Sequence, residues 1–115
     1  MHELGVTFSI MDSLEKVAEQ NNVKHINKVV LELGEVSTVI PQYLIDCWNW
    51  ASKKRELFND CNIVIEPLQA VSYCNNCKKK FETTKYGKTC PVCDKDDTYL
   101  ICGNEFNIKE IEVYN

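Results

Sequence analysis

Apolar residues recur at helical spacing near the start of the chain. They stand three or four positions apart, with polar residues between them, which predicts an amphipathic helix over residues 4 to about 20. Asn21-Asn22 is a suitable stop for this helix. The residues of the apolar face are Ile10, Met11, Leu14, Val17 and Ala18.

Three segments show the alternation typical of strands. The first runs over 26–33 and ends at Gly34, and the second runs over 63–66, where Pro67 predicts an edge position or an exit from the sheet. The third runs over 106–113, and its alternation slips once near Lys109, as a bulge would produce.

A second helix is predicted to begin at Pro41, because the first helical turn accepts proline. An apolar face follows at helical spacing, and both tryptophans, Trp48 and Trp50, are interpreted as core or packing residues rather than as a binding platform. The residues of this face are Leu44, Cys47, Trp48, Ala51 and Phe58.

Two C-x-x-C pairs, Cys74/Cys77 and Cys90/Cys93, are separated by twelve residues. Two such pairs on facing turns supply the four soft ligands of a tetrahedral structural zinc ion. A thioredoxin-like redox motif has a single pair beside a βαβ pattern, so the spacing favours zinc. The intervening segment is polar and lysine-rich, and metal ligation therefore has to supply most of the folding energy of this lobe.

The predicted order is helix, strand, helix, strand, zinc lobe, strand. This order indicates an α+β fold, with two helices packed on a small three-stranded sheet and an inserted zinc-ribbon lobe with four cysteine ligands. The expected domains are an α/β domain formed by 1–70 plus 104–115, and a zinc-binding domain over 71–103. The chain of 115 residues has room for one compact core and such a lobe.

The composition narrows the functional classes. A net charge of −4 argues against a general affinity for nucleic acid, and no apolar run is long enough to cross a bilayer. The seven cysteines are an odd number, and four have zinc spacing, so we expect a reducing cytoplasm. The other three, Cys47, Cys61 and Cys102, are expected to be small, mostly buried apolar residues.

The first three residues, Met1, His2 and Glu3, offer a second set of metal ligands. The α-amine of Met1, the backbone nitrogen of His2 and its imidazole can chelate one ion, and Glu3 can add an oxygen. Such nitrogen-rich, near-planar coordination suits Ni(II) or Cu(II) rather than zinc. Taken alone the pattern is weak, because a solvated terminal histidine is common. The other histidine, His25, is expected to have no metal role.

Several motifs together resemble the HypA family of hydrogenase nickel-incorporation proteins. They are Met1-His2-Glu3 at the start of a helix, Leu31-Glu32-Leu33-Gly34-Glu35 at a strand end, the four-cysteine lobe, and Gly103-Asn104-Glu105 before the last strand. The resemblance covers essentially the whole chain.

The resemblance implies a nickel metallochaperone rather than an enzyme. It implies zinc held for structure by Cys74, Cys77, Cys90 and Cys93, and nickel held as transient cargo by Met1, His2 and Glu3. The implied partners are the nickel-binding GTPase HypB and the large subunit of [NiFe] hydrogenase. The chain is expected to be a monomer or a homodimer.

Two departures from the family pattern matter. Gly5 replaces an expected polar residue in the first helical turn. No histidine flanks the zinc cysteines, as it does in relatives that also serve urease, so a urease role is not implied here.

Two other classes compete with the metallochaperone interpretation. A zinc-ribbon nucleic-acid or transcription module often has this cysteine spacing, but it needs a basic surface with exposed stacking residues. A zinc enzyme needs an open coordination position, which four thiolates do not leave.

Overall fold

The computed structural model describes residues 3–114, and their contacts divide the chain into two compact units. The first unit holds the described residues of Met1–Glu32, Thr38–Glu66 and Asn107–Asn115. The second holds Leu33–Ser37 and Pro67–Phe106. The chain therefore passes from one unit to the other repeatedly, rather than completing one before it begins the next.

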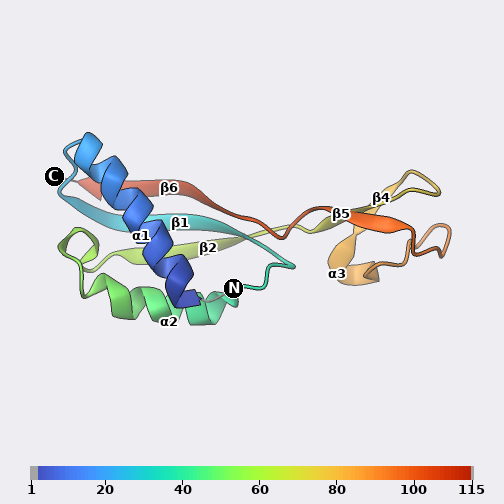
Figure 1. Ribbon diagram of the computed structural model, residues 1–115, viewed down its shortest axis with the longest axis horizontal. Coiled ribbons are helices and arrows are strands. Elements are labelled where there is room, and N and C mark those ends of the chain that lie inside the picture. Colours follow the sequence, from blue (N-terminus) through green and yellow to red (C-terminus); the bar gives the residue numbers. More distant parts are fainter. Residues whose placement is uncertain (1–2, 115) are drawn as a thin grey trace. The chain divides into compact units, whose positions relative to one another are not determined.

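The first unit is a helical layer on a sheet. Helices α1 (Glu3–Gln20) and α2 (Pro41–Ser52) lie over one face of a three-stranded sheet of order β2-β1-β6 (Figure 1). The strands are β2 (Asn62–Leu68), β1 (His25–Gly34) and β6 (Phe106–Tyr114). The predicted α+β class is confirmed, with both helices and all three strands near their expected positions.

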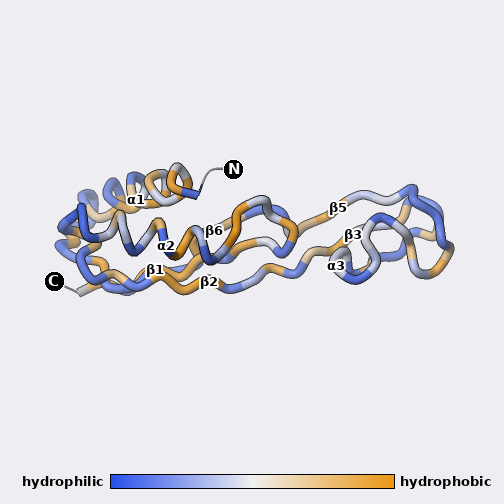
Figure 2. Tube along the Cα trace, turned by 90° about the horizontal axis from the view of Figure 1, so that it is seen from below, coloured by the Kyte–Doolittle hydropathy of each residue, from blue (hydrophilic) through white to orange (hydrophobic). Residues whose placement is uncertain are grey.

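Helix α1 forms because its apolar side chains fall on one face. Figure 2 shows hydrophobic and hydrophilic positions alternating along α1 and α2. The helix ends as predicted, since Asn21 Nδ2 donates to the Val17 carbonyl at 2.8 Å and Asn22 adopts a left-handed φ of 56°. The prediction for Val17 is wrong, because this side chain is 44% exposed. The buried residues of α1 are Val6, Thr7, Ile10, Met11, Leu14 and Ala18.

Helix α2 begins at Pro41 as predicted, but it stops at Ser52. Phe58 therefore belongs to a separate 3-10 turn, η1 (Glu56–Phe58), and not to the helix. It still reaches the core, where it meets the fully buried Trp48 ring edge-on at 5.5 Å between ring centroids. The indole Nε1 of Trp48 donates to the Cys61 carbonyl at 3.1 Å, which satisfies the one polar atom of this ring.

The two tryptophans have different environments. Trp48 is a core residue, as expected, whereas Trp50 is 52% exposed and the interpretation of it as a core residue is wrong. The reason is geometric: Trp50 is two positions, or about 200°, around the helix from Trp48. It therefore leaves the face that packs on the sheet.

Strand β1 occupies the centre of its sheet and is buried on both sides for part of its length. Val29 and Leu31 on one face are 0% and 1% exposed, and Val30 on the other is 4% exposed. Strand β2 lies at an edge of the sheet, which explains why Pro67 is tolerated there.

The second unit contains a sheet of its own, of order β4-β3-β5, which the sequence analysis did not predict. Its elements are β3 (Val71–Cys74), β4 (Lys80–Glu82), α3 (Thr83–Tyr86) and β5 (Thr98–Cys102). Both pairings are antiparallel; Tyr73 faces Lys80 on one side and Tyr99 on the other. The strands are too short and too polar to be recognised from alternation alone.

Backbone segments approach closely at the base of the second unit. Gly34 N donates to the Glu105 carbonyl at 2.8 Å, and Glu35 Oε1 accepts from Ala70 N at 2.8 Å. A Cβ atom on Gly34 would lie 1.9 Å from the Gly103 carbonyl oxygen, so only glycine fits there. The Leu-Gly-Glu and Gly-Asn-Glu motifs therefore meet in space.

Among the helices in residues 3–114, none has the length and apolar character needed to span a membrane.

Candidate metal centre

Two similar turns hold the four cysteines of the second unit. In the first, Lys78 N donates to the Cys74 carbonyl at 2.8 Å and Cys74 N donates to the Lys79 carbonyl at 2.9 Å. The second turn repeats this pattern: Asp94 N donates to Cys90 O at 2.8 Å and Cys90 N donates to Lys95 O at 3.0 Å. The two C-x-x-C pairs therefore fold as a matched pair of knuckles.

In each knuckle, the residue directly after the second cysteine adopts the left-handed backbone conformation. Lys78 has a φ of 59° and Asp94 a φ of 58°. This conformation is uncommon for residues other than glycine and turns the chain back so that the backbone N–H groups point toward the sulfurs. The amino-acid types of Lys78 and Asp94 do not predict this conformation, and the only sequence signal for it is that each residue directly follows a C-x-x-C pair.

The four thiol sulfurs converge on one point. The Sγ atoms of Cys74, Cys77, Cys90 and Cys93 all lie within 4.8 Å of one another. Cys74 and Cys93 are 3.5 Å apart, and Cys77 and Cys90 are 3.4 Å apart. A tetrahedral ion with Zn–S bonds of about 2.3 Å separates its sulfurs by about 3.8 Å, so this arrangement fits Zn²⁺ after a small expansion.

The centre also serves as the core of its unit. Cys74 and Cys90 are 0% exposed and pack with Phe81, while Cys77 and Cys93 lie half-buried against this cluster. One aromatic ring and four sulfurs bury too little apolar surface to hold three short strands together. Metal ligation is therefore the main source of stability available to this sheet.

Two of the four thiols, Cys77 and Cys90, have pKa values shifted in opposite directions. Burial raises the pKa of Cys90, but hydrogen bonds from the backbone N–H groups of Cys93 and Val92 outweigh it and lower the pKa to about 7. Burial, followed by the hydrogen bond with Cys90, raises the pKa of Cys77 to about 12. The hydrogen bond between the two thiols raises the pKa of Cys77 and lowers that of Cys90, and a bound cation would favour the deprotonated form of both.

Of the predicted nickel ligands, Met1 and His2 lie outside the described residues, whereas Glu3 is the first residue of α1. Its Oε2 accepts a hydrogen bond from Ile40 N at 3.1 Å, at the position that precedes α2. This contact is not predictable from the sequence pattern, because residues 3 and 40 are far apart along the chain.

The remaining cysteines stand apart from the centre. Within residues 3–114, the four-cysteine cluster is the one group of three or more histidine, cysteine or acidic side chains close enough to hold an ion. Cys61 is buried as expected, but Cys47 and Cys102 are only half-buried. His25 lies within 2.5 Å of the Asn59 carbonyl through its Nε2.

The fold and the site together define a class of protein. It is a small α+β protein with a cluster of four cysteine thiols that could hold a metal ion, and a tetrahedral ion bound by all four would have no open position for a substrate. The centre is therefore suited to structure rather than to catalysis.

Comparison with known proteins identifies the family. The sequence model of the family described as "Hydrogenase/urease nickel incorporation, metallochaperone, hypA" matches residues 1–113. The chain is 30% identical to the hydrogenase maturation factor HypA of Geotalea uraniireducens over 114 residues, covering 98% of this chain and 99% of that one. It is 32% identical to that of Actinobacillus succinogenes over 113 residues, with 98% and 99% covered.

A solved structure has the same fold. The solution structure of the Ni metallochaperone HypA from Helicobacter pylori superposes with a TM-score of 0.73 at 22% sequence identity, covering 98% of this chain and 97% of that one. The chain belongs to the HypA family, and it is a nickel metallochaperone for hydrogenase nickel incorporation rather than an enzyme.

Proposed function

We propose that the protein binds two metals with different roles. Zn²⁺ is held for structure by Cys74, Cys77, Cys90 and Cys93, and Ni²⁺ is carried transiently by the Met1 α-amine, the backbone nitrogen and imidazole of His2, and Glu3. The corresponding domains are a nickel-binding domain, 1–70 plus 104–115, and a zinc-binding domain, 71–103.

The closed thiolate cluster is the observation that carries this proposal. A nickel-incorporation protein has to accept and release nickel, whereas a tetrahedral cage of four sulfurs suits zinc and exchanges its ion slowly. The cargo therefore needs a second site, and the described residues 3–114 contain no other cluster of potential ligands. The nitrogen donors of the amino terminus remain as the candidates.

The chemistry of these donors suits a carrier. Deprotonated amide, amine and imidazole nitrogens favour the near-planar coordination that Ni²⁺ accepts. A chelate at a chain end exchanges its ion more readily than a closed cage does. Protons compete for the amine and imidazole, so acidification promotes release.

The partners follow from the same proposal. We expect the nickel-binding GTPase HypB to take part in delivery and the large subunit of [NiFe] hydrogenase to receive the ion, in a reducing cytoplasm. None of the seven cysteines forms a disulfide in this fold, and four of them form the thiol cluster, which supports such a compartment. Urease is a less favoured recipient, because no histidine lies beside the thiolate centre to couple it to pH.

Calorimetry tests the location of the nickel site. Nickel is titrated into the untagged chain, into His2→Ala, and into a chain with extra residues before Met1. We expect the last two to lose most of their affinity. His25→Ala is the matched control, since it removes the only other histidine and should bind as the native chain does. Equal binding by all four proteins rules out the terminal site.

A further inference from the structure

Helix α2 has two apolar stripes, and the core uses only one of them. The buried stripe consists of Leu44, Trp48 and Ala51, which are 1%, 0% and 0% exposed. The second stripe faces solvent and consists of Ile40 at the helix cap, Tyr43, Cys47 and Trp50. Ile40, Tyr43 and Trp50 are 48%, 56% and 52% exposed, and Cys47 is half-buried.

The spacing of the exposed stripe matches that of a helix-packing seam. Its members follow one another at intervals of three, four and three residues, as the apolar positions of a coiled-coil heptad do. Contiguous exposed apolar side chains often mark an interaction surface, whereas single exposed apolar residues scattered over a surface do not.

A groove lies beside this stripe. It has a volume of about 280 Å³ and is lined by Leu4 of α1 and by Asp46, Cys47 and Trp50 of α2, with a lining that is mostly apolar. This volume suits one or two anchoring side chains rather than a whole small-molecule ligand, whose pockets begin at about 300 Å³.

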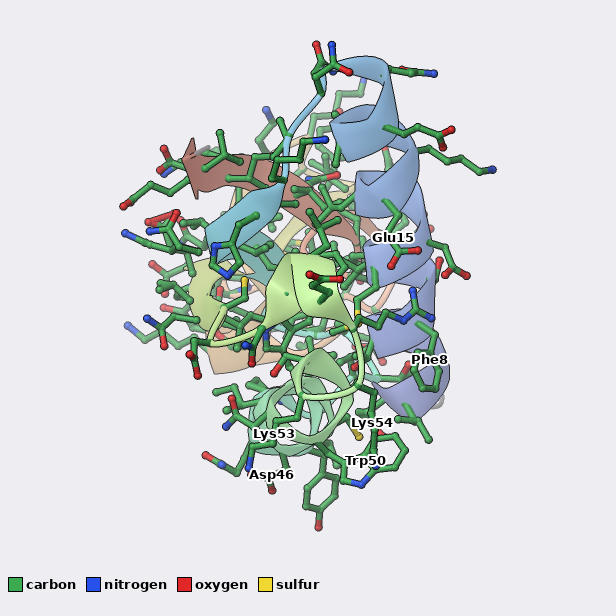
Figure 3. All side chains as sticks on the ribbon, turned by 90° about the vertical axis from the view of Figure 1, so that its left-hand side faces the viewer. Phe8, Glu15, Asp46, Trp50, Lys53 and Lys54 are labelled. Atoms are coloured by element: carbon green, nitrogen blue, oxygen red, sulfur yellow. The ribbon has the colours of Figure 1, made fainter. Side chains whose placement is uncertain are left out.

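Two lysines, Lys53 and Lys54, follow α2 directly and add positive charge at its end. Lys54 Nζ lies 5.2 Å from the centroid of the Trp50 ring, and Figure 3 shows Lys54 beside Trp50 and Lys53 on the side of the helix where Asp46 lies. Within residues 3–114, neither lysine forms an ion pair. The adjacent Arg55 differs, because it binds Asp12 at 2.9 Å and Glu15 at 3.3 Å and so ties η1 to α1.

We propose that the exposed stripe of α2 and its groove form a docking seam for an acidic amphipathic helix of a partner protein that delivers or receives nickel. Apolar residues of the partner helix cover Tyr43 and Trp50, and its carboxylates pair with Lys53 and Lys54. That the partner handles nickel rests on the proposed function, since Leu4 in the groove directly follows the proposed nickel ligands.

A partner helix fits the seam better than a second copy of this chain does. Asp46 is the only acidic residue in α2, and its Oδ1 already accepts a hydrogen bond from Gln42 Nε2 at 3.0 Å. A paired α2 from another copy would therefore offer one carboxylate against two lysines. The two lysines are complemented better by a helix that carries more carboxylates than α2 does.

Binding measurements on paired variants test the seam. The probes are the purified HypB GTPase and the large subunit of [NiFe] hydrogenase, each titrated with the native chain, Trp50→Ala and the double variant Lys53→Glu/Lys54→Glu. The matched controls are Tyr99→Ala, at a side chain that is 53% exposed in the second unit, and Lys85→Glu/Lys88→Glu, which makes the same change of charge. Circular dichroism verifies that each variant is folded.

The proposal predicts that both seam variants bind at least one probe about tenfold or more weakly, while both controls bind as the native chain does. Unchanged binding by the seam variants overturns it, as does a native chain that binds neither probe. The proposal is also overturned if sedimentation equilibrium shows that the native chain is a dimer and that Trp50→Ala is a monomer. The seam would then bind a second copy of the chain. Nickel calorimetry on the same variants should be unchanged, so failure of the terminal nickel site is distinguishable from failure of the seam.

Discussion

The Oε2 atom of Glu3 accepts a hydrogen bond from the backbone N–H of Ile40 at 3.1 Å, and so joins the first residue of α1 to the cap of α2. Ile40 has no side-chain oxygen with which to cap the helix. In a capping box, the side chain of the third helical residue accepts a hydrogen bond from the N-cap backbone N–H. Glu3 makes the same hydrogen bond to the N-cap of α2, but from α1. Its negative charge also interacts favourably with the dipole at the N-terminus of α2.

The hydrogen bond of Glu3 to Ile40 and its proposed role as a nickel ligand give a prediction that separates the two. Glu3→Ala should lower the free energy of unfolding by about 0.5–1 kcal/mol, because it removes the acceptor for the Ile40 N–H. Glu3→Gln keeps an acceptor oxygen and should lose less stability, yet it should weaken nickel binding as much as Glu3→Ala does. Urea unfolding and nickel calorimetry measure the two effects. If Glu3→Gln binds nickel as the native chain does, Glu3 is a cap and not a ligand.

Removal of the thiolate-bound metal should unfold one unit and spare the other. The cluster of Cys74, Cys77, Cys90 and Cys93 forms most of the core between β3, β4 and β5. A strong chelator should therefore collapse the amide resonances of these strands in a nuclear magnetic resonance spectrum, while those of α1 and α2 persist. Retention of dispersed resonances for β3 after complete metal removal would show that the sheet is stable without an ion.

Two glycines should respond in opposite ways to alanine. Gly34→Ala places a Cβ 1.9 Å from the Gly103 carbonyl oxygen, so the backbone has to move, and we expect a loss of about 3 kcal/mol or more. Gly5 lies in α1 with no atom within 4 Å of the added methyl group. Gly5→Ala should therefore stabilise the helix by about 0.5–1 kcal/mol. Thermal unfolding of the two variants tests the contrast, and equal effects would contradict it.

The buried Cys61 thiol should make stability depend on alkaline pH. Burial raises its pKa from 9.0 to about 11, against a smaller lowering by its hydrogen bond with Trp48. Because the folded pKa lies above the unfolded one, this contribution is complete below pH 9 and is lost as the pH rises toward 11.

The stability difference between the native chain and Cys61→Ala isolates this effect. The advantage of the native chain should shrink by about 2 kcal/mol between pH 9 and pH 11. Cys47→Ala serves as the matched control in the same unit. A pH-independent difference between the native chain and Cys61→Ala would contradict the assigned burial effect.

The elements of the first unit were predictable because their signals are local. Apolar spacing located α1, Pro41 located the start of α2, and alternation with Gly34 located β1. Trp50 was misassigned because helical spacing alone does not reveal which of two apolar stripes meets the sheet. Phe58 was assigned to α2 because it stands at helical spacing from the apolar face of that helix, although the helix ends at Ser52 and Phe58 belongs to η1.

The convergence of the four cysteines was predictable from the sequence, but the sheet around them was not. The C-x-x-C spacing indicated all four sulfurs, and the structure brings them together. The sheet that carries them was missed, since β4 is three residues long and its pairing with β3 depends on the metal knuckles rather than on apolar alternation. The contact from Glu3 to Ile40 joins distant positions, and only the folded chain reveals it.

Native mass spectrometry of the untagged protein tests the two-metal account most directly. The purified chain should contain one zinc ion, and addition of nickel should produce a species that holds one zinc and one nickel. His2→Ala should retain its zinc and gain no nickel. Displacement of the zinc by nickel, or a second metal that binds equally well to His2→Ala, would contradict the account.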